Sequence, residues 1–505
     1  MLSKKTVLLF LIFLLALILR FLYFPQNTYF GFDQARDAYA VREILGGHLK
    51  ITGPPTANGI FHHGVLYYYI FAPFYLFAGG DPSAISAFLR VLNASGVFIL
   101  YFITLALFGS IAALLASFLF AISYEQTQFS LFLNHPSFAV MSVLIFYLGL
   151  STWIFRKRAW GLLLALFGLG LSIQFEFIEV QLIGVFILYA LFFRKEIHQL
   201  NFRNILLGLF ALLLPLSTYI ISETKNNFLI IKQIPGMFIN STALAGGSSF
   251  QQFLFIINRH FQDNFSANPI VASILAIAFL VTLSIFLIKN VLRKEFIFLS
   301  LWFFGGLMVY FLIDNDAYFY NTGTSISLLI FTAFLVSKIF SKNKPLAFSI
   351  LALIVISNIF LITKNNPLGP NQKINPQIGL LLKDQEKMLD FIYQSAQGKD
   401  FAVNTLTMPY NINTTWSYLF EWYGAKIYGY TPVWGGDAAK GFPGNLQIER
   451  ARSKLPDKRF LIIEPLEGIP TYLIDSFITN EKKYSTTIEI KRIGTMQVWV
   501  QQPKQ

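Results

Sequence analysis

Long apolar segments recur through the first 364 residues of this chain. Of its 505 residues 55% are hydrophobic and 13% are charged, whereas soluble domains carry about 25% charged residues. A helix that crosses a membrane needs roughly 20 mostly apolar residues. About eleven segments meet this description, near 6–24, 84–107, 110–122, 137–155, 159–175, 178–193, 204–221, 269–288, 296–313, 321–340 and 345–363. The sequence therefore predicts an integral membrane protein that is mostly α-helical, a polytopic helix bundle.

Two apolar segments need separate interpretation. The first, 6–24, follows Lys4-Lys5 and is not followed by a small-residue cleavage site, so we expect an uncleaved anchor. The segment 65–78 is too short for a span and contains Pro73. We expect an interfacial or re-entrant helix there.

Basic residues gather in alternating connections between the apolar segments, and such connections face the cytoplasm. This pattern accounts for the net charge of +13, so no nucleic-acid partner is expected. An odd number of spans then places the N-terminus in the cytoplasm and the C-terminus outside the plasma membrane. The basic residues are Lys4, Lys5, Arg156, Lys157, Arg158, Arg194, Lys195, Arg203, Lys289, Arg293, Lys294, Lys338, Lys342 and Lys344.

The predicted outer face carries the polar segments. A first outer loop covers 25–83 and a long outer loop covers 222–268. After 364 the composition changes, and residues 370–505 hold 16 Lys and Arg against 13 Asp and Glu. Helical spacing in 383–394, an apolar run at 460–463 and a hairpin pattern in 486–501 predict a soluble α+β domain over 365–505, outside the membrane, joined to a transmembrane module over 1–364.

An acidic pair in the first outer loop is the leading candidate for chemistry. Asp33 and Asp37 are four residues apart, so a helix presents both on one face, with Arg36 between them. Two such carboxylates can divide the work of a general base and an orienting group. The alternative is an ordinary solvated helix in a loop. A carboxylate at the membrane boundary is costly and is a functional hypothesis by default.

The next candidates are His62, His63 and Tyr67. Histidine can bind metal, accept a proton or donate to phosphate. Adjacent histidines project differently, so we expect no shared metal ion and no cofactor, and the absence of cysteine excludes thiolate ligands. A divalent metal ion bound by Asp33, Asp37, His62 and His63 is the alternative, although their spacing matches no specific motif. Tyr67 is equally explained as an interfacial aromatic anchor.

Several other polar residues occur at outer span ends. Glu176 and Glu179 either line a cavity or reach the headgroups from a helix end, whereas Glu125 and Glu223 are weaker cavity candidates. Arg90 and Arg259 are candidates for binding a phosphate, because arginine matches phosphate geometry. Snorkelling is the alternative for Arg90. The segment Asn134-His135-Pro136 is interpreted as a helix cap.

The pattern resembles the GT-C glycosyltransferase superfamily, and within it the branch of protein O-mannosyltransferases and the aminoarabinose transferase of lipid A. That branch shows Asp-Glu in the first outer loop and Lys/His-Pro-Pro-Leu before aromatic residues. This chain has Asp33-Gln34 and then His63-Gly64-Val65-Leu66-Tyr67, so a glutamine and a Gly-Val pair depart from the pattern. The layout is similar over 6–365 and the motifs over 30–95.

The resemblance implies a membrane hexosyl- or pentosyltransferase. Such an enzyme moves a sugar from a polyprenyl-phosphate donor to a hydroxyl of a protein, lipid or glycan at the outer face, with inversion. It implies Asp33 as the general base and His63 facing the donor phosphate. A transporter or lipid flippase, in which Glu176 and Glu179 relay protons, is the alternative, and a membrane scaffold or receptor is a third.

Overall fold

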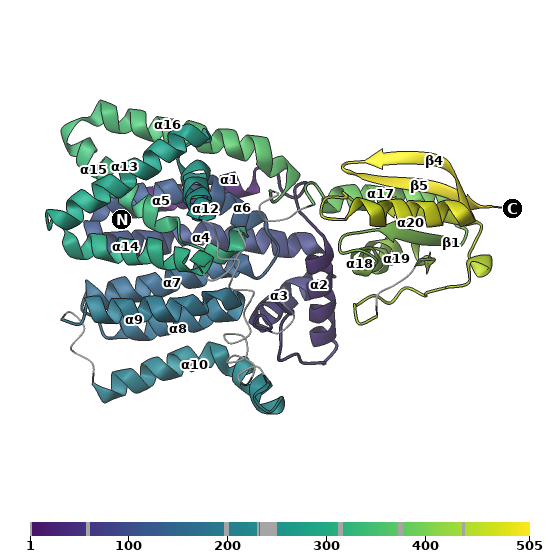
Figure 1. The fold of residues 1–505 in the computed structure, drawn as a ribbon, viewed down its shortest axis with the longest axis horizontal. Helices are drawn as coiled ribbons and strands as arrows, with labels where there is room; N and C mark the ends of the chain where they lie inside the picture. Colours follow the sequence, from purple (N-terminus) through teal and green to yellow (C-terminus); the bar gives the residue numbers. More distant parts are fainter. Residues whose placement is uncertain are drawn as a thin grey trace.

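The chain folds into a large helical body with a smaller sheet-containing lobe at one end (Figure 1). The computed structural model describes residues 3–56, 61–195, 201–229, 232, 250–311, 317–371, 377–436 and 440–504. The N-terminus lies in the helical body and the C-terminus in the lobe. A mostly helical fold with a C-terminal α+β domain was expected, and both features are confirmed.

Each of the eleven expected spans overlaps a helix of the body, although residues 312–313 of the span expected at 296–313 lie outside the described residues. Five of these helices are long and apolar enough to cross a membrane, and a sixth is obtained if α5 and α6, bent by 53°, form one broken span. The total of eleven spans therefore stays a prediction. The helices are α1 (Lys4–Phe21), α4 (Pro82–Phe108), α5 (Ser110–Ile122), α7 (Pro136–Ile154), α8 (Trp160–Phe175), α9 (Leu182–Phe192), α10 (Phe202–Lys225), α13 (Pro269–Ile288), α14 (Arg293–Leu307), α15 (Ile326–Lys342) and α16 (Lys344–Asn365).

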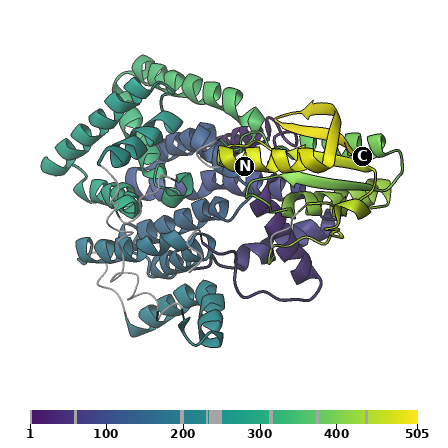
Figure 2. The same cartoon turned by 45° about the vertical axis from the view of Figure 1, so that its right-hand side comes forward.

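Burial separates a central helix from peripheral ones. The apolar window of α7 is 89% buried inside the protein, whereas those of α10, α13 and α16 are only 17–22% buried. Helices α10 and α16 border the body on opposite sides in both Figure 1 and Figure 2. Their exposed faces are rich in Leu, Ile and Phe, which is the surface expected against lipid rather than water.

Helices α7 and α8 pack closely because small residues line their contact. A Cβ atom added to Gly149 would lie 2.2 Å from the backbone nitrogen of Ala165, and one added to Gly168 would lie 2.5 Å from that of Phe146. In a membrane, where lipid is as apolar as leucine, such close backbone approach drives helix association. This contact holds the start of α7 beside the end of α8, where the candidate site lies.

Four short helices cover the end of the body that faces the lobe: α2 (Phe32–Leu45), α3 (Leu66–Phe77), α6 (Tyr124–Leu131) and α12 (Phe250–Asn264). Helix α3 corresponds to the apolar segment 65–78 and, with 12 residues, is too short to span a bilayer. Helix α12 belongs to the predicted long outer loop. Residues 230–231 and 233–249 of that loop lie outside the described part of the chain.

The C-terminal lobe is a five-stranded mixed sheet with strand order β2-β1-β3-β5-β4. The central strand β3 (Lys458–Ile463) is parallel to β1 (Phe401–Leu406) and antiparallel to β5 (Met496–Pro503). The edges are β2 (Val433–Trp434) and β4 (Ser485–Ile493), and β4 forms the predicted hairpin with β5. The main helices are α17 (Leu382–Ala396), α18 (Thr414–Leu419) and α20 (Thr471–Tyr484).

The lobe is fastened to the first outer loop rather than only to the end of α16. The backbone N–H of Leu382 donates to the carbonyl of Thr28 at 2.8 Å, and that of Phe30 donates to Leu380 at 3.2 Å. The side chain of Gln385 donates to the Phe30 carbonyl at 2.8 Å. Apolar residues of α2, α3 and the lobe form one continuous core. The segment before α2 is thus held by the lobe.

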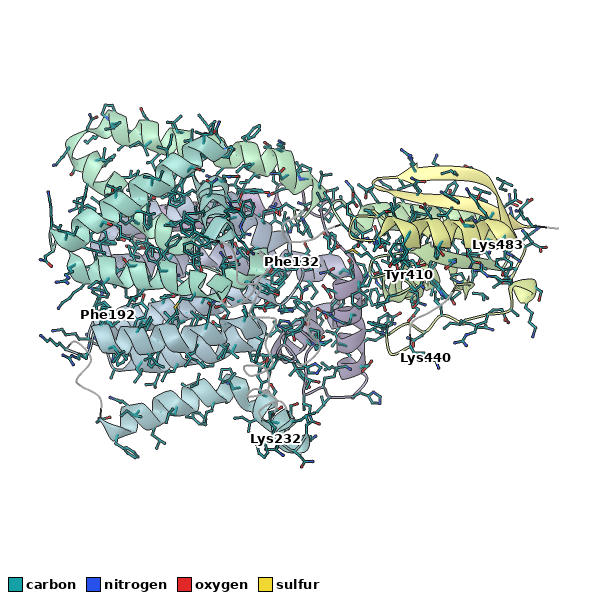
Figure 3. All side chains as sticks on the ribbon, viewed as in Figure 1. Phe132, Phe192, Lys232, Tyr410, Lys440 and Lys483 are labelled. Atoms are coloured by element: carbon teal, nitrogen blue, oxygen red, sulfur yellow. The ribbon has the colours of Figure 1, made fainter. Side chains whose placement is uncertain are left out.

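The predicted orientation in the membrane can be tested, because the chain has no cysteine. Single cysteines are introduced at the exposed residues Arg158, between α7 and α8, and Lys483, on α20 of the lobe (Figure 3). In intact cells or right-side-out vesicles, we expect a membrane-impermeant maleimide to label Lys483→Cys but not Arg158→Cys. After permeabilisation both should react. Labelling of Arg158→Cys alone before permeabilisation would show the opposite orientation.

Candidate active site

The acidic pair lies at the start of α2, and a single arginine joins its members. Arg36 Nη1 lies 2.7 Å from a carboxylate oxygen of Asp33, and Nη2 lies 2.8 Å from one of Asp37. The side chain of Asp33 is 42% exposed, whereas that of Asp37 is 3% exposed. The helical spacing expected from the sequence is confirmed. The structure adds that one carboxylate reaches solvent and the other does not.

Gln34, the residue that departs from the superfamily pattern, fixes the start of α2. Its amide oxygen accepts from the backbone N–H of Gly31 at 3.1 Å, and its amide nitrogen donates to the carbonyl of Leu133 at 3.0 Å. The side chain is buried. An ionised carboxylate at this position has no N–H to give to Leu133. Gln34 therefore joins α2 to the turn that carries His135.

Two tyrosines of α3 lie beneath the acidic pair. The hydroxyl of Tyr68 donates to Asp37 at 3.1 Å, and the rings of Tyr67 and Tyr68 are 4.3 Å apart. Tyr67 is fully buried, so it is not the interfacial anchor that the sequence left open. The pKa of Asp37 is raised from 3.8 to about 6, because burial and the nearby Asp33 charge raise it by more than Arg36 lowers it.

A second cluster of polar side chains, His63, His135 and Glu176, lies next to Tyr67 on the side of the helical body. The rings of Tyr67 and His135 are 5.5 Å apart, and those of His135 and His63 are 3.9 Å apart. Glu176 lies 3.5 Å from Nδ1 of His63 through Oε1 and 3.2 Å from Nδ1 of His135 through Oε2. Burial is the main cause that lowers the pKa of both imidazoles to about 3 and raises that of Glu176 to about 7.

His135 is the site residue that the sequence analysis did not identify. It was interpreted as part of a helix cap, and it does precede α7, with Pro136 at the first helical position. One signal was available in the sequence. Asn134 and His135 are polar residues at the predicted outer end of one span, and Glu176 lies at the predicted outer end of the following span. Their proximity depends on how α7 and α8 pack.

A cavity of about 590 Å³ opens beside Arg36 and Tyr68. Its walls come from α2, from the segment 49–55 that follows α2, and from residues 441–443 of the lobe. Tyr39 and Lys50 add polar groups, and Phe442 adds an aromatic ring. The lobe therefore forms one side of a cavity that reaches Arg36, the partner of both carboxylates.

Two other predicted residues form a separate buried network. Glu125 accepts from Asn264 at 2.7 Å, lies 3.1 Å from Nδ1 of His260, and is also bonded by Ser325. Arg259, the neighbour of His260, is buried and lies 3.4 Å from Asn321. This network joins α6, α12 and α15, and its members show no contact with the acidic pair among the described residues. The donor-binding role of Arg259 stays a prediction.

The remaining predicted residues lie at the rim of the site or within the fold. Glu179 and Glu223 are buried. The backbone carbonyl of His62 accepts from Tyr219 at 2.9 Å. Arg90 is fully buried and donates to Ser86 at 3.2 Å, to Asn27 at 2.8 Å and to the carbonyl of Arg20. All three of its nitrogens are therefore used inside the protein, which favours a structural role over phosphate binding.

Comparisons with known proteins agree with this architecture. Residues 62–221 match the family model described as dolichyl-phosphate-mannose-protein mannosyltransferase. This match includes His63, His135 and Glu176 but not Asp33. A search of curated protein sequences gives no match.

Solved structures share the fold over most of the chain. ArnT from Cupriavidus metallidurans bound to undecaprenyl phosphate superposes with a TM-score of 0.61 at 10% identity, covering 99% of this chain and 98% of ArnT. Its apo state gives 0.56 at 12% identity, with the same coverage. An oligosaccharyltransferase from Archaeoglobus fulgidus tethered with an acceptor peptide gives 0.52 at 13% identity, covering 82% of this chain and 62% of that protein. The expected resemblance to the GT-C superfamily is confirmed.

The raised pKa of Asp37 predicts a measurable titration. In difference infrared spectra of wild type against Asp37→Asn, we expect a protonated-carboxyl band that grows as the pH falls through about 6. The folded chain takes up this proton before the unfolded chain does. The contribution of Asp37 to stability therefore increases as the pH falls from about 6 toward 3.8. A band that appears only near pH 4 would contradict the burial argument.

The structural role of Arg90 predicts a loss of stability on truncation. Arg90→Ala leaves the Asn27 oxygen and the Arg20 carbonyl without this donor, at roughly 1–3 kcal/mol each, and it also opens a cavity. Thermal unfolding in detergent should show a lower melting temperature than wild type, whereas Arg158→Ala, at an exposed loop, should not. If Arg90→Ala melts at the same temperature as wild type, the structural role assigned to Arg90 is wrong.

Proposed function

We propose that this protein is a membrane glycosyltransferase that moves a sugar from a polyprenyl-phosphate donor to an acceptor hydroxyl at the outer face. The observation that carries the proposal is the half-exposed carboxylate of Asp33, which is held by Arg36, a residue that also lines a cavity beside the lobe. The fold shared with ArnT, which was solved with undecaprenyl phosphate, supports this choice of donor.

Asp33 is the proposed general base. It is the accessible member of the pair, and a base must come within hydrogen-bond distance of the proton it removes. Asp37 is buried and bonded to both Arg36 and Tyr68. We assign it a positioning role: it fixes Arg36, and Arg36 in turn fixes the carboxylate of Asp33.

The reaction is a single displacement. Asp33 takes the proton of the acceptor hydroxyl as the oxygen attacks the anomeric carbon. The bond from that carbon to the phosphate oxygen breaks, and the lipid phosphate leaves with the electron pair. One displacement inverts the anomeric centre. Positively charged groups near the leaving phosphate lower the barrier by stabilising the developing charge, and Arg36 is the guanidinium closest to the proposed base.

The cavity beside Arg36 is the proposed acceptor site. Its volume of about 590 Å³ is within the range of small-molecule sites, and it presents tyrosines, a lysine and the ring of Phe442 to an incoming group. The lobe contributes Gly441, Phe442 and Pro443. We therefore assign the lobe a share in acceptor selection. The lipid of the donor would lie against the apolar outer helices.

The direct test is sugar release from a lipid carrier. Purified full-length protein in nanodiscs is given a panel of radiolabelled polyprenyl-phosphate sugars with candidate acceptors. Replacing a general base costs 10²–10⁴-fold in rate, so we expect Asp33→Asn to lose at least about 100-fold in kcat while its melting temperature stays near that of wild type.

The matched control is Asp475→Asn, an exposed acidic residue on α20 of the lobe. It should retain wild-type transfer. If wild type transfers sugar and Asp33→Asn does so at the same rate, the assignment of the base is wrong. If no donor of a broad panel is consumed by wild type, the proposed activity fails, and transport of the same lipids becomes the reaction to measure.

A further inference from the structure

We propose that His63, His135 and Glu176 form a binding site for a divalent metal ion of the zinc class. The site lies behind Tyr67, on the body side of the acidic pair. The proposal concerns the three side chains themselves, so it stands or falls separately from the proposed transferase activity. It also differs from the expectation of a metal-free protein that the sequence suggested.

The distances between the ligand atoms suit a small tetrahedral ion. Zinc bonds histidine nitrogen and carboxylate oxygen at about 2.0–2.2 Å, so neighbouring ligand atoms of a tetrahedron are about 3.3–3.6 Å apart. Oε1 of Glu176 lies 3.5 Å from Nδ1 of His63, and Oε2 lies 3.2 Å from Nδ1 of His135. One ligand atom from each of the three residues lies within 4.8 Å of the others.

Two of these ligand atoms have no hydrogen-bond partner among the described residues. Nδ1 of His135 and Oε2 of Glu176 are 3.2 Å apart, yet both are buried without a hydrogen-bond partner among the described residues. Buried polar atoms without partners are rare in native proteins and need an explanation such as a missing ion. A cation between the two atoms would satisfy both, because each would direct a lone pair at it.

The surroundings of His63 show which form of the ring is present. The backbone N–H of Phe177 donates to Nδ1 of His63 at 3.5 Å, so this nitrogen carries no proton, and an ion bound there would replace this long hydrogen bond. The same atom faces a carboxylate oxygen of Glu176. Two acceptors that face each other repel, and the two imidazoles, with centroids 3.9 Å apart and planes tilted by 34°, cannot both be protonated without further repulsion. A cation bound between Nδ1 of His63 and the Glu176 oxygen would remove the repulsion between these two acceptors without a proton on either ring.

The composition of the donor set indicates the class of metal. Neutral imidazole suits zinc and its transition-metal neighbours, whereas magnesium and calcium prefer oxygen ligands. Three protein ligands leave a fourth position open, as in catalytic zinc sites. Oε1 of Glu179 is also buried without a hydrogen-bond partner in the described residues, and Glu179 adds charge next to Glu176. Water would complete the tetrahedron.

The three ligands are held by backbone contacts before any ion binds. His63 exchanges backbone hydrogen bonds with the segment 53–54 at 2.9 and 3.0 Å, and the N–H of Gly64 donates to the carbonyl of Gln174 at 2.9 Å. A Cβ atom at Gly64 would lie 1.5 Å from the side chain of Gln174. The loop of His63 is therefore pressed against the end of α8, two residues before Glu176.

Metal content and coordination test the proposal. Full-length protein in detergent, with its affinity tag removed, is stripped with a chelator and reloaded with Zn²⁺, and the bound metal is measured by mass spectrometry. Reloading with Co²⁺ gives visible absorption that reports tetrahedral coordination. We expect about one ion per chain in wild type. His135→Gln and Glu176→Gln should each weaken Zn²⁺ binding at least about 100-fold, since even outer groups that orient a ligand cost 10–100-fold when lost.

The matched control is His48→Gln, an exposed histidine after α2, which should bind Zn²⁺ like wild type. Melting temperatures of the stripped proteins show whether each variant is folded. The proposal is overturned if stripped, folded wild type binds no Zn²⁺ at micromolar concentration, or if both ligand variants bind it like wild type. Metal bound without any sugar transfer would leave this site intact and remove only the proposed activity.

Discussion

The absence of water inside the bilayer is the constraint on which the rest of this structure depends. Backbone polar groups in that region must pair within helices, and charged side chains are driven toward the two faces. Carboxylates consequently lie on short helices and at helix ends rather than inside the long apolar segments. Asp33 and Asp37 lie on α2, and Glu176 follows the last residue of α8. Glu176 lies close to His63 and His135 although no sequence motif spans the three residues.

Local features of the site could be predicted from the sequence, because they depend only on helical geometry. The face shared by Asp33, Arg36 and Asp37 follows from a spacing of three and four residues, and the helices themselves follow from apolar length. The mixed sheet was anticipated through its apolar strand and its hairpin. Its strand order was not, because parallel pairing of β1 with β3 joins segments more than fifty residues apart.

Contacts between distant segments could not be predicted. His135 lies close to His63 because α7 and α8 approach closely at glycines. The sequence alone does not show which helix will pack against a given glycine. Arg90 and Arg259 showed the opposite problem. Arg90 lies near the outer end of an apolar helix and Arg259 lies on α12 of the long outer loop, and either position fits both a ligand contact and an internal brace. For Arg90, the acceptors of its hydrogen bonds are Asn27 and the carbonyl of Arg20, and these partners favour the internal brace.

The backbone pairing between residues 28–30 and 380–382 has a consequence for how such proteins can exchange parts. The linker after α16 looks like the natural boundary of the lobe, yet the lobe also hydrogen-bonds to the segment that leads into α2. A lobe transplanted from a relative would meet a foreign N-terminal segment at this seam. A chimaera that preserves the geometry of Asp33 would therefore need residues 28–30 and 380–382 from the same parent, although these segments are 350 residues apart in the chain.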